Sequence, residues 1–369
     1  MIKEHCYTKE WLEAFKKQKE HKSIQIDILE RMIYALHLLE RLKSKGLEFT
    51  FKGGTSLVLL LEEGTRFSID IDIVCNTERG EVEEILNTII EDSQFSEYQL
   101  DDHRSYKPGI PKAHYKFLFD SVVNPKVQGG ILLDILIEES IYPETIETTI
   151  DTKWIETEGE TKVTTPSIPS ITGDKLTAFA PNTIGIPYDK EGHDATIEIS
   201  KQLYDLARLF ENVTEMPVIV ESFMRHAEQE IGFRKSVDAG YDVSPNNVLE
   251  DTIETCLTIA RREKNPTDKT KENFKRLEKG IRSFGSGYLM QGHFRIDNAL
   301  AASARVAYLA AKILKKDMSP IEHYADQDIK ELTIESADYA YLNKLKKQPN
   351  KSIFYYWHLT IGLLTKESK

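Results

Sequence analysis

The sequence is poor in cysteine: Cys6, Cys75 and Cys256 are the three in 369 residues, and none stands in a CxxC or Cys/His pattern. Such an odd, scattered set predicts neither a disulfide framework nor a zinc site. The chain also has no run approaching the ~18–20 apolar residues that a membrane helix needs, and its charged N-terminus contains no apolar signal core. We therefore expect reduced thiols and a cytoplasmic location, with neither export nor membrane insertion.

Positive charge is in short supply. The 48 Lys and Arg residues stand against 60 Asp and Glu, which gives a formal net charge of −12. Because neutralisation of phosphates by Lys and Arg dominates nonspecific binding to nucleic acid, this balance excludes a protein that coats nucleic acid. A local basic surface remains compatible with it, since residues 261–282 carry nine basic and four acidic residues. Two interpretations stay open for this segment: a solvated helix-loop-helix face, or a surface that meets RNA or a partner protein.

Several familiar signatures of nucleotide-binding proteins are missing, namely the Walker A pattern GxxxxGK[ST], GxGxxG, and the HRD and DFG motifs of kinases. What the sequence does contain is FKGGTSLVLLLEEGTRFSIDIDIVC at residues 51–75. This stretch has a glycine pair followed by two hydroxyl residues, then an apolar run, then an acidic pair. The glycine pair or the acidic pair alone is weak evidence for nucleotide binding, because a glycine pair is most often only a turn. Their combination indicates a triphosphate held through metal.

The local pattern of this stretch is strand, glycine turn, helix, strand. We predict a short strand at residues 48–52, a helix at 55–62 and a second strand at 68–74. In the second strand three isoleucines alternate with Ser68, Asp70 and Asp72. A period of two places the isoleucines on one face and both carboxylates on the other.

The glycine turn supplies the groups that would meet phosphate. Gly53 and Gly54 have no side chains, so the backbone N–H groups that open the following helix can approach a triphosphate, helped by the helix dipole. Thr55 or Ser56 can add a hydroxyl donor.

A third carboxylate, Asp134, interrupts the apolar run at residues 130–137, which we predict to be a strand. Burying a carboxylate is costly unless it is paired, so a nearby metal ion or cation would account for it. The alternative is a sheet edge that faces water. With Asp70 and Asp72, it would provide hard oxygen ligands for divalent ions, which suits two-metal phosphoryl or nucleotidyl transfer.

The rest of the chain divides into an α/β part and a helical part. The first part has further predicted helices at residues 9–21, 24–45 and 81–91, a strand at 114–119, and strand fragments with a linker at 142–170. Gly46 is expected to end the helix at 24–45. Helical patterns then dominate at residues 170–180, 195–211, 248–262 and 298–316.

The segments KGGTSLVL and RFSIDIDI resemble the signature of the AbiEii/AbiGii nucleotidyltransferase family, the toxin halves of bacterial abortive-infection and toxin–antitoxin pairs within the polymerase-β-like superfamily. The resemblance covers about residues 48–210 in its specific motifs. It implies an α/β (α+β) nucleotidyltransferase core with a mixed sheet, followed by an all-α helical C-terminal region. We expect domains at residues 1–165 and 166–369, with the second contributing site residues.

The resemblance also assigns site residues. It adds Arg66 and Ser68, from the family's Arg-Phe-Ser triplet, to the nucleotide-binding set. It implies that Lys175, in GDKLTAFA, neutralises triphosphate charge, and that Asp205 positions this lysine or the acceptor. A compact ammonium suits phosphate. Judged by residue type alone, both side chains would be solvated polar residues on amphipathic helices.

The function implied is nucleotidyl transfer that depends on Mg²⁺ or Mn²⁺, from an NTP to an acceptor, with the 3′ end of tRNA as the leading acceptor and an antitoxin protein as a partner. Two alternatives stay open: transfer to a protein side chain, and a catalytically silent nucleotide-binding module. The loop at residues 182–194 is interpreted as a lid, an acceptor contact or an insertion, and we expect His193 within it to have a surface role.

Overall fold

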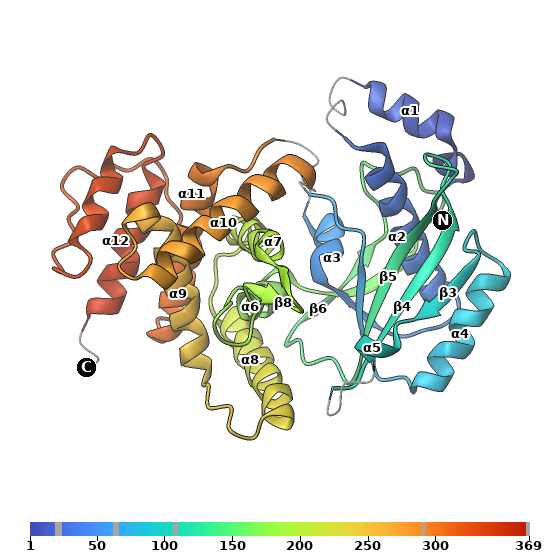
Figure 1. The fold of residues 1–369 in the computed structure, drawn as a ribbon, viewed down its shortest axis with the longest axis horizontal. Coiled ribbons are helices and arrows are strands. Elements are labelled where there is room, and N and C mark those ends of the chain that lie inside the picture. Colours follow the sequence, from blue (N-terminus) through green and yellow to red (C-terminus); the bar gives the residue numbers. More distant parts are fainter. Residues whose placement is uncertain (19–23, 62–65, 106–109, 290–291, 367–369) are drawn as a thin grey trace. The chain divides into compact units, whose positions relative to one another are not determined.

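The computed structural model divides into two compact units (Figure 1). It describes residues 1–18, 24–61, 66–105, 110–289 and 292–366. The first unit is Met1–Ser167 together with Tyr288–Gly292, and the second is Ile168–Gly287 together with His293–Lys369. The segment that returns to the first unit is held by its backbone: the Phe67 N–H donates to the Tyr288 carbonyl at 3.0 Å.

Within the described residues, the first unit contains a seven-stranded sheet in the order β3-β4-β5-β2-β1-β7-β6. The strands are β1 (Thr50–Lys52), β2 (Ile71–Cys75), β3 (Glu97–Leu100), β4 (Lys112–Asp120), β5 (Gln128–Ile137), β6 (Thr145–Thr149) and β7 (Lys162–Pro166). The β2/β5 and β1/β7 pairs are parallel and the other neighbours are antiparallel. The predicted mixed sheet is therefore confirmed.

Helices accompany this sheet along the chain. They are the 3-10 helix η1 (Glu4–Tyr7), α1 (Lys9–Lys17), α2 (Ile26–Ser44), α3 (Gly53–Leu60), α4 (Arg79–Glu91) and α5 (Asp102–Ser105). Gly46 has a φ of +87° just past α2, as expected of a residue that ends a helix. The last residues of the helices predicted at 9–21 and 55–62 lie outside the described residues.

The core of the first unit forms between α2 and one face of the sheet (Figure 1). The strand residues Phe51, Ile71 and Ile73 are at most 1% exposed, as are Leu133 and Ile135. Burial of each such side chain contributes about 1.5–3 kcal/mol relative to leaving it exposed. Because side chains alternate along a strand, this packed face fixes the direction of the polar residues on the opposite face.

The second unit is helical, which confirms the expected helical C-terminal region. Its elements are α6 (Ile168–Ala178), α7 (Thr196–Phe210), α8 (Pro217–Val237), α9 (Pro245–Arg261), α10 (Asp268–Gly287), α11 (Ile296–Leu314), α12 (Ser352–Thr365), the 3-10 helices η3 (Arg262–Lys264) and η4 (Ala340–Lys347), and a hairpin of β8 (Asp189–Lys190) and β9 (His193–Asp194). The alanine-rich α11 packs against α7, α9 and α12. At Gly173 in α6 a Cβ would overlap the backbone of α8, so glycine permits this close helix packing.

Searched across the described ranges, the structure has no helix with both the length and the apolarity needed to cross a bilayer. The three cysteines are free thiols and all are buried.

Candidate active site

Four side chains on four neighbouring strands form a row across the face of the sheet opposite the core. The register pairs Lys52 of β1 with Asp72 of β2, and Asp72 with Asp134 of β5. Asp134 is paired in turn with His114 of β4. Residues in register on adjacent strands point to the same side of a sheet. One cation, two carboxylates and an imidazole thus lie side by side, all partly buried.

His114 is a site residue that the sequence analysis missed. Its Nδ1 lies 2.7 Å from Asp134 Oδ1, and the two side chains are 12% and 25% exposed. An ionised carboxylate only accepts hydrogen bonds, so Nδ1 is the donor. The backbone N–H of His114 donates to Ser105 Oγ at 2.9 Å, which ties this point of β4 to α5. Nothing in the local pattern of residues 112–120 marks this histidine, because only the register between β4 and β5 brings it to Asp134.

Gly53 and Asp72 meet across the turn between β1 and α3. Gly53 has a φ of +76°, and a Cβ added there would overlap the Asp72 carboxylate. A side chain at this position is therefore excluded both by backbone conformation and by space. The glycine turn and the second aspartate of the acidic pair are in direct contact.

Gly54 meets the Arg-Phe-Ser triplet in the same way. A Cβ on Gly54 would overlap the Arg66 guanidinium and stand 3.0 Å from Ser68 Oγ. Arg66 is only 7% exposed, and its Nη1 donates to the Phe67 carbonyl at 3.3 Å. The structure therefore brings the triplet and Asp72 into contact with the glycine pair, although these residues span 20 positions of the sequence.

The two hydroxyl residues of the turn have structural contacts. Thr55 Oγ1 donates to the Asp70 carbonyl at 2.5 Å, and Ser56 Oγ donates to the Gly53 carbonyl at 2.9 Å. Both side chains are fully buried. Since these bonds engage the hydroxyl hydrogens, a contact from Thr55 or Ser56 to phosphate requires a change of partner, and it stays a prediction.

Asp70 differs from Asp72 in its surroundings. The strand begins at Ile71 rather than at residue 68, so Asp70 stands just before β2 and is exposed. The Thr55 hydroxyl bond to its carbonyl fixes the backbone here. The predicted alternation holds for Asp72, which lies between the buried Ile71 and Ile73.

The fit of this row to a divalent ion rests on Asp72 and Asp134. Nowhere in the described part of the chain do three or more His, Cys, Asp or Glu side chains form a group ready to hold a metal. Mg²⁺ is usually bound through one or two carboxylates together with substrate phosphates, rather than by a cage of protein ligands. Asp72 and Asp134 are in register, and the Asp72 carboxylate contacts Gly53 of the turn. This arrangement suits such a metal–nucleotide complex.

Lys175 and Asp205 form an ion pair inside the second unit. Lys175 Nζ of α6 lies 2.9 Å from Asp205 Oδ2 of α7, and it donates to Gln202 Oε1 at 3.0 Å. The side chains are 7% and 2% exposed. Removing one partner of such a pair leaves an uncompensated buried charge, which costs about 3–5 kcal/mol. The two residues that the resemblance singled out are thus in contact, and Gln202 joins them.

The second half of the loop at residues 182–194 forms the β8/β9 hairpin. Glu191 and Gly192, at the turn, have φ values of 53° and 82°, the conformation of a tight two-residue hairpin turn. Arg276 of α10 holds the hairpin through Asp189 at 2.8 Å and the Tyr188 carbonyl at 2.6 Å. His193 lies exposed in β9.

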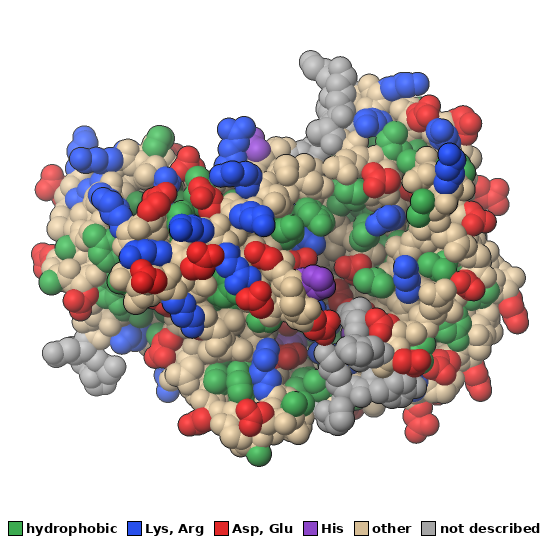
Figure 2. Space-filling view, in the orientation of Figure 1, with side chains coloured by type: hydrophobic (Ala, Val, Ile, Leu, Met, Phe, Trp, Pro, Cys, Tyr) green, Lys and Arg blue, Asp and Glu red, His purple; other side chains and the backbone are tan. Residues whose placement is uncertain are grey.

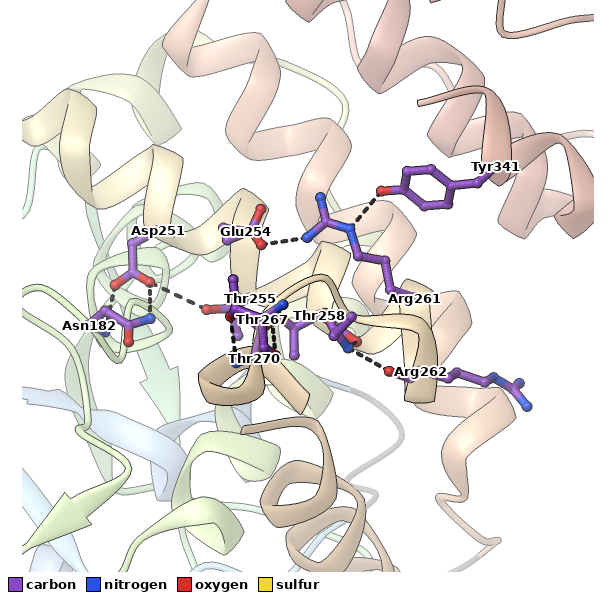
Figure 3. A network of polar contacts seen from close by, with 11 residues as sticks. Asn182, Asp251, Glu254, Thr255, Thr258, Arg261, Arg262, Thr267, Thr270 and Tyr341 are labelled. Atoms are coloured by element: carbon purple, nitrogen blue, oxygen red, sulfur yellow. Dashed lines mark hydrogen bonds and ion pairs between the residues drawn. The ribbon is translucent and has the colours of Figure 1, made fainter. Parts of the chain in front are cut away.

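The start of the same loop is bound to α9 through Asp251 (Figure 3). The backbone and side-chain nitrogens of Asn182 each donate to the Asp251 carboxylate at 2.7 Å, and Thr183 Oγ1 donates at 2.9 Å. Burial raises the pKa of the Asp251 carboxyl, and these donors act in the opposite direction. The loop is therefore fixed at its start and in its hairpin.

Known proteins resemble this chain in sequence family and in fold. The model of the family described as "Nucleotidyl transferase AbiEii toxin, Type IV TA system" matches residues 37–301. Among solved structures, the chain is similar to MenT4, a nucleotidyltransferase toxin from Mycobacterium tuberculosis H37Rv, with 13% identity, a TM-score of 0.51, and coverage of 96% of this chain and 99% of that chain. It is also similar to a candidate nucleotidyltransferase from H. pylori, with 15% identity, a TM-score of 0.42, and coverage of 80% and 97%. A search of the curated proteins gave no match.

Proposed function

Since the chain belongs to the AbiEii family of nucleotidyltransferase toxins, we propose that it transfers a nucleotide from an NTP to the 3′ end of a tRNA, with the help of Mg²⁺ or Mn²⁺. The observation that carries the metal-dependent part is the register of Asp72 with Asp134 beside the glycine turn. The acceptor rests on the resemblance of the motifs. A modified tRNA end would block translation, which accounts for toxicity.

The roles of the residues in the first unit follow from their positions. Asp72 and Asp134 hold the metal–nucleotide complex, and the exposed Asp70 adds a carboxylate at the open end of β2. A divalent ion bound there would neutralise triphosphate charge and lower the pKa of an attacking hydroxyl. The N–H groups of Gly53 and Gly54 open α3 and face the phosphates with the positive end of the helix dipole.

Arg66 is a cation in contact with this turn, and Lys52, which precedes Gly53, is another beside it. The Arg66 guanidinium lies where a Cβ of Gly54 would stand, so it is held against the first turn of α3. A guanidinium offers several donors in a planar fork, which suits phosphate oxygens. In this proposal Arg66 and Ser68 bind the nucleotide beside the backbone donors.

Lys175 supplies further positive charge in the proposal, and Asp205 is its positioning residue. The ion pair of 2.9 Å and the Gln202 contact fix the ammonium group between the packed helices α6 and α7. A fixed cation costs little reorganisation when negative charge develops on a leaving pyrophosphate.

The test is incubation of the purified protein with each labelled NTP in turn and a total cell extract. The labelled product is then digested with nuclease or with protease. Label released by nuclease supports the RNA acceptor, label released by protease indicates transfer to a protein side chain, and NTP binding without label in any product indicates a silent binding module.

We expect Asp72→Ala to lower incorporation by at least about 10²-fold, as loss of one preorganised charge-stabilising group does. Incorporation by this variant at the wild-type rate would remove the metal assignment.

A cognate antitoxin follows from the family description as a type IV toxin–antitoxin member. We propose that it is encoded beside this gene and that both act in the cytoplasm, where the tRNA pool is. Expression of the toxin alone should arrest growth, and co-expression of the neighbouring gene should restore it. Arrest that persists with either neighbouring gene present would contradict this partner.

A further inference from the structure

Basic side chains form a stripe along the exposed face of α10. The stripe consists of Lys271, Lys275, Lys279 and Arg282, and all four are exposed. Their spacing of four, four and three residues keeps them within an arc of about 80° over about 16 Å of helix. The opposite face of α10 is buried through Phe274, Leu277, Ile281 and Phe284.

The two central lysines of this stripe, Lys275 and Lys279, are neither buried nor paired with a carboxylate among the described residues. In the part of the chain that the structure describes, the ammonium groups of Lys275 and Lys279 have no hydrogen bond and no carboxylate partner. Like charges four residues apart destabilise a helix. The outer members of the stripe are paired, Lys271 with Asp268 and Arg282 with Glu278, so a polyanion would relieve the repulsion between the two central lysines.

The stripe ends at a cavity of about 490 Å³ within the second unit. Arg282, His293 and Arg295 line this cavity with positive or polar groups, and Phe294 and Ile296 line it with apolar surface. The Glu278 carboxylate also lines it and lies 3.9 Å from the Arg282 guanidinium. At Gly285 a Cβ would overlap the Phe294 carbonyl, so the backbone before α11 lies directly against α10. A cavity of this size with cations at its rim can take one nucleotide of a longer strand.

The surroundings favour a nucleic acid over a protein as the occupant. The second unit has 28 Lys and Arg against 29 Asp and Glu, whereas the first has 20 against 31, so the second unit is close to neutral and the first carries most of the net negative charge. Figure 2 shows Lys and Arg side chains, with Asp and Glu side chains between them, over the region where Figure 1 places α10 and its neighbours. None of the exposed large hydrophobic residues lies on α10, and protein interfaces depend on such anchors.

We propose that the stripe and its cavity form a docking surface for the backbone of an acceptor RNA, with one nucleotide seated against Arg282, His293 and Arg295. This inference rests on the proposed function, because it gives that transferase a surface for its RNA. Lysines suit this task as point charges that neutralise phosphates without reading sequence. Of the two interpretations that the sequence left open for residues 261–282, this proposal takes the surface that meets RNA.

The experiment measures binding of a fluorescein-labelled, unfractionated tRNA pool by anisotropy, in EDTA and without NTP, for the full-length protein. We expect K275E/K279E to bind at least about tenfold more weakly than the wild type and to lower the salt-dependence slope by about 1.4 to 1.8. The matched control is K9E/K17E, which reverses two exposed lysines of α1 in the first unit and should bind as the wild type does. K275A/K279A, which favours helix, should weaken binding in the same direction.

The outcomes separate this inference from the transfer reaction. Asp72→Ala should bind the tRNA pool normally while failing to incorporate nucleotide. Equal binding by K275E/K279E and by the α1 control would overturn the docking surface even if transfer to RNA occurs. Displacement of the tRNA by polyglutamate at an equal concentration of charge would also overturn it, since an acidic protein would then serve as well.

Discussion

At Gly53, backbone conformation and space act together. The φ of +76° costs a residue with a side chain roughly 1–3 kcal/mol, and a Cβ would displace the Asp72 carboxylate. We expect Gly53→Ala to lower the free energy of unfolding by at least that amount and nucleotide incorporation by at least about 10²-fold. Urea unfolding and the labelled-NTP assay measure the two effects.

Gly46 provides the control for this substitution. It has a φ of +87°, and a Cβ there would meet no described atom within 4 Å. Gly46→Ala should therefore show a loss of stability from strain alone and retain full incorporation. If Gly53→Ala were as active as Gly46→Ala, the placement of Asp72 by the glycine turn would have no part in catalysis.

His114 holds one oxygen of Asp134, and its role can be tested by keeping or removing the donor. Asn places an N–H near the position of Nδ1, whereas Leu fills a similar volume without a donor. We expect His114→Leu to weaken Mg²⁺ binding by about 10–100-fold, as loss of a contact that orients a metal ligand does, and His114→Asn to stay close to the wild type. A Mg²⁺ titration of incorporation and Mn²⁺ binding followed by electron paramagnetic resonance both report this. Indistinguishable Mn²⁺ binding by the Leu variant and the wild type would argue against the positioning role.

The residues of the site differ in how far the sequence predicts them. The alternation of isoleucine with aspartate directs Asp72 away from the core, and Ile71 and Ile73 are indeed buried. The contact between Asp134 and His114 is different, because it depends on how β4 and β5 are registered, and the side-chain period of two within one strand contains no information about its neighbour. For the same reason the pairing of Asp72 with Asp134 emerges only from the sheet.

Among the elements, α2 carries a buried histidine that makes the first unit sensitive to acid. His37 is 6% exposed, and its pKa is lowered to about 4, mainly by burial and further by the positive charge of Arg41. The unfolded chain binds this proton near pH 6.5, so the folded state loses stability as the pH falls from about 6.5 to 4, by roughly 3 kcal/mol in all. The loss is complete below the folded pKa and absent above the unfolded one.

Replacing this histidine isolates its contribution. Between pH 7 and pH 5 the free energy of unfolding should fall in both proteins. We expect the fall to be about 2 kcal/mol smaller in His37→Leu than in the wild type. Urea titrations at the two pH values give the difference. Parallel losses in both proteins would show that the folded and unfolded chains bind the His37 proton equally well, so that its burial has no effect on acid stability.

The elements themselves were predictable where their periodicity was strong. The helices α2, α7, α9 and α11 lie where apolar residues recur every three or four positions, and β4 and β5 where strands were expected. The strand β3 was not predicted, and β6 and β7 were recognised only as fragments. These strands are four or five residues long, and β3 and β6 have no fully buried position. Their sequences therefore show little of the alternation of apolar and polar residues that marks a half-buried strand.

At the scale of the whole molecule, the first unit is not continuous in sequence. Tyr288–Gly292 returns to it, and Leu289 forms an antiparallel bridge with Arg66. A fragment of residues 1–167 lacks this segment, so we expect its Phe67 amide to lose the Tyr288 carbonyl as acceptor. Hydrogen exchange at Phe67 should be much faster in the fragment than in the full chain, whereas exchange at Ile73 should change little. Equal protection of Phe67 in both would contradict the importance of the returning segment.

The same returning segment sets an order of events during synthesis. Residue 288 is made about 120 residues after residue 167, a delay of about 6 to 24 s at ~5–20 residues per second. Throughout that interval the backbone beside Arg66, which lies against Gly54, has no partner from residues 288–292. A member of a toxin family built in this way does not complete the backbone around its glycine turn until most of the chain has been synthesised, so an interval of seconds separates the first unit's own residues from the segment that completes it.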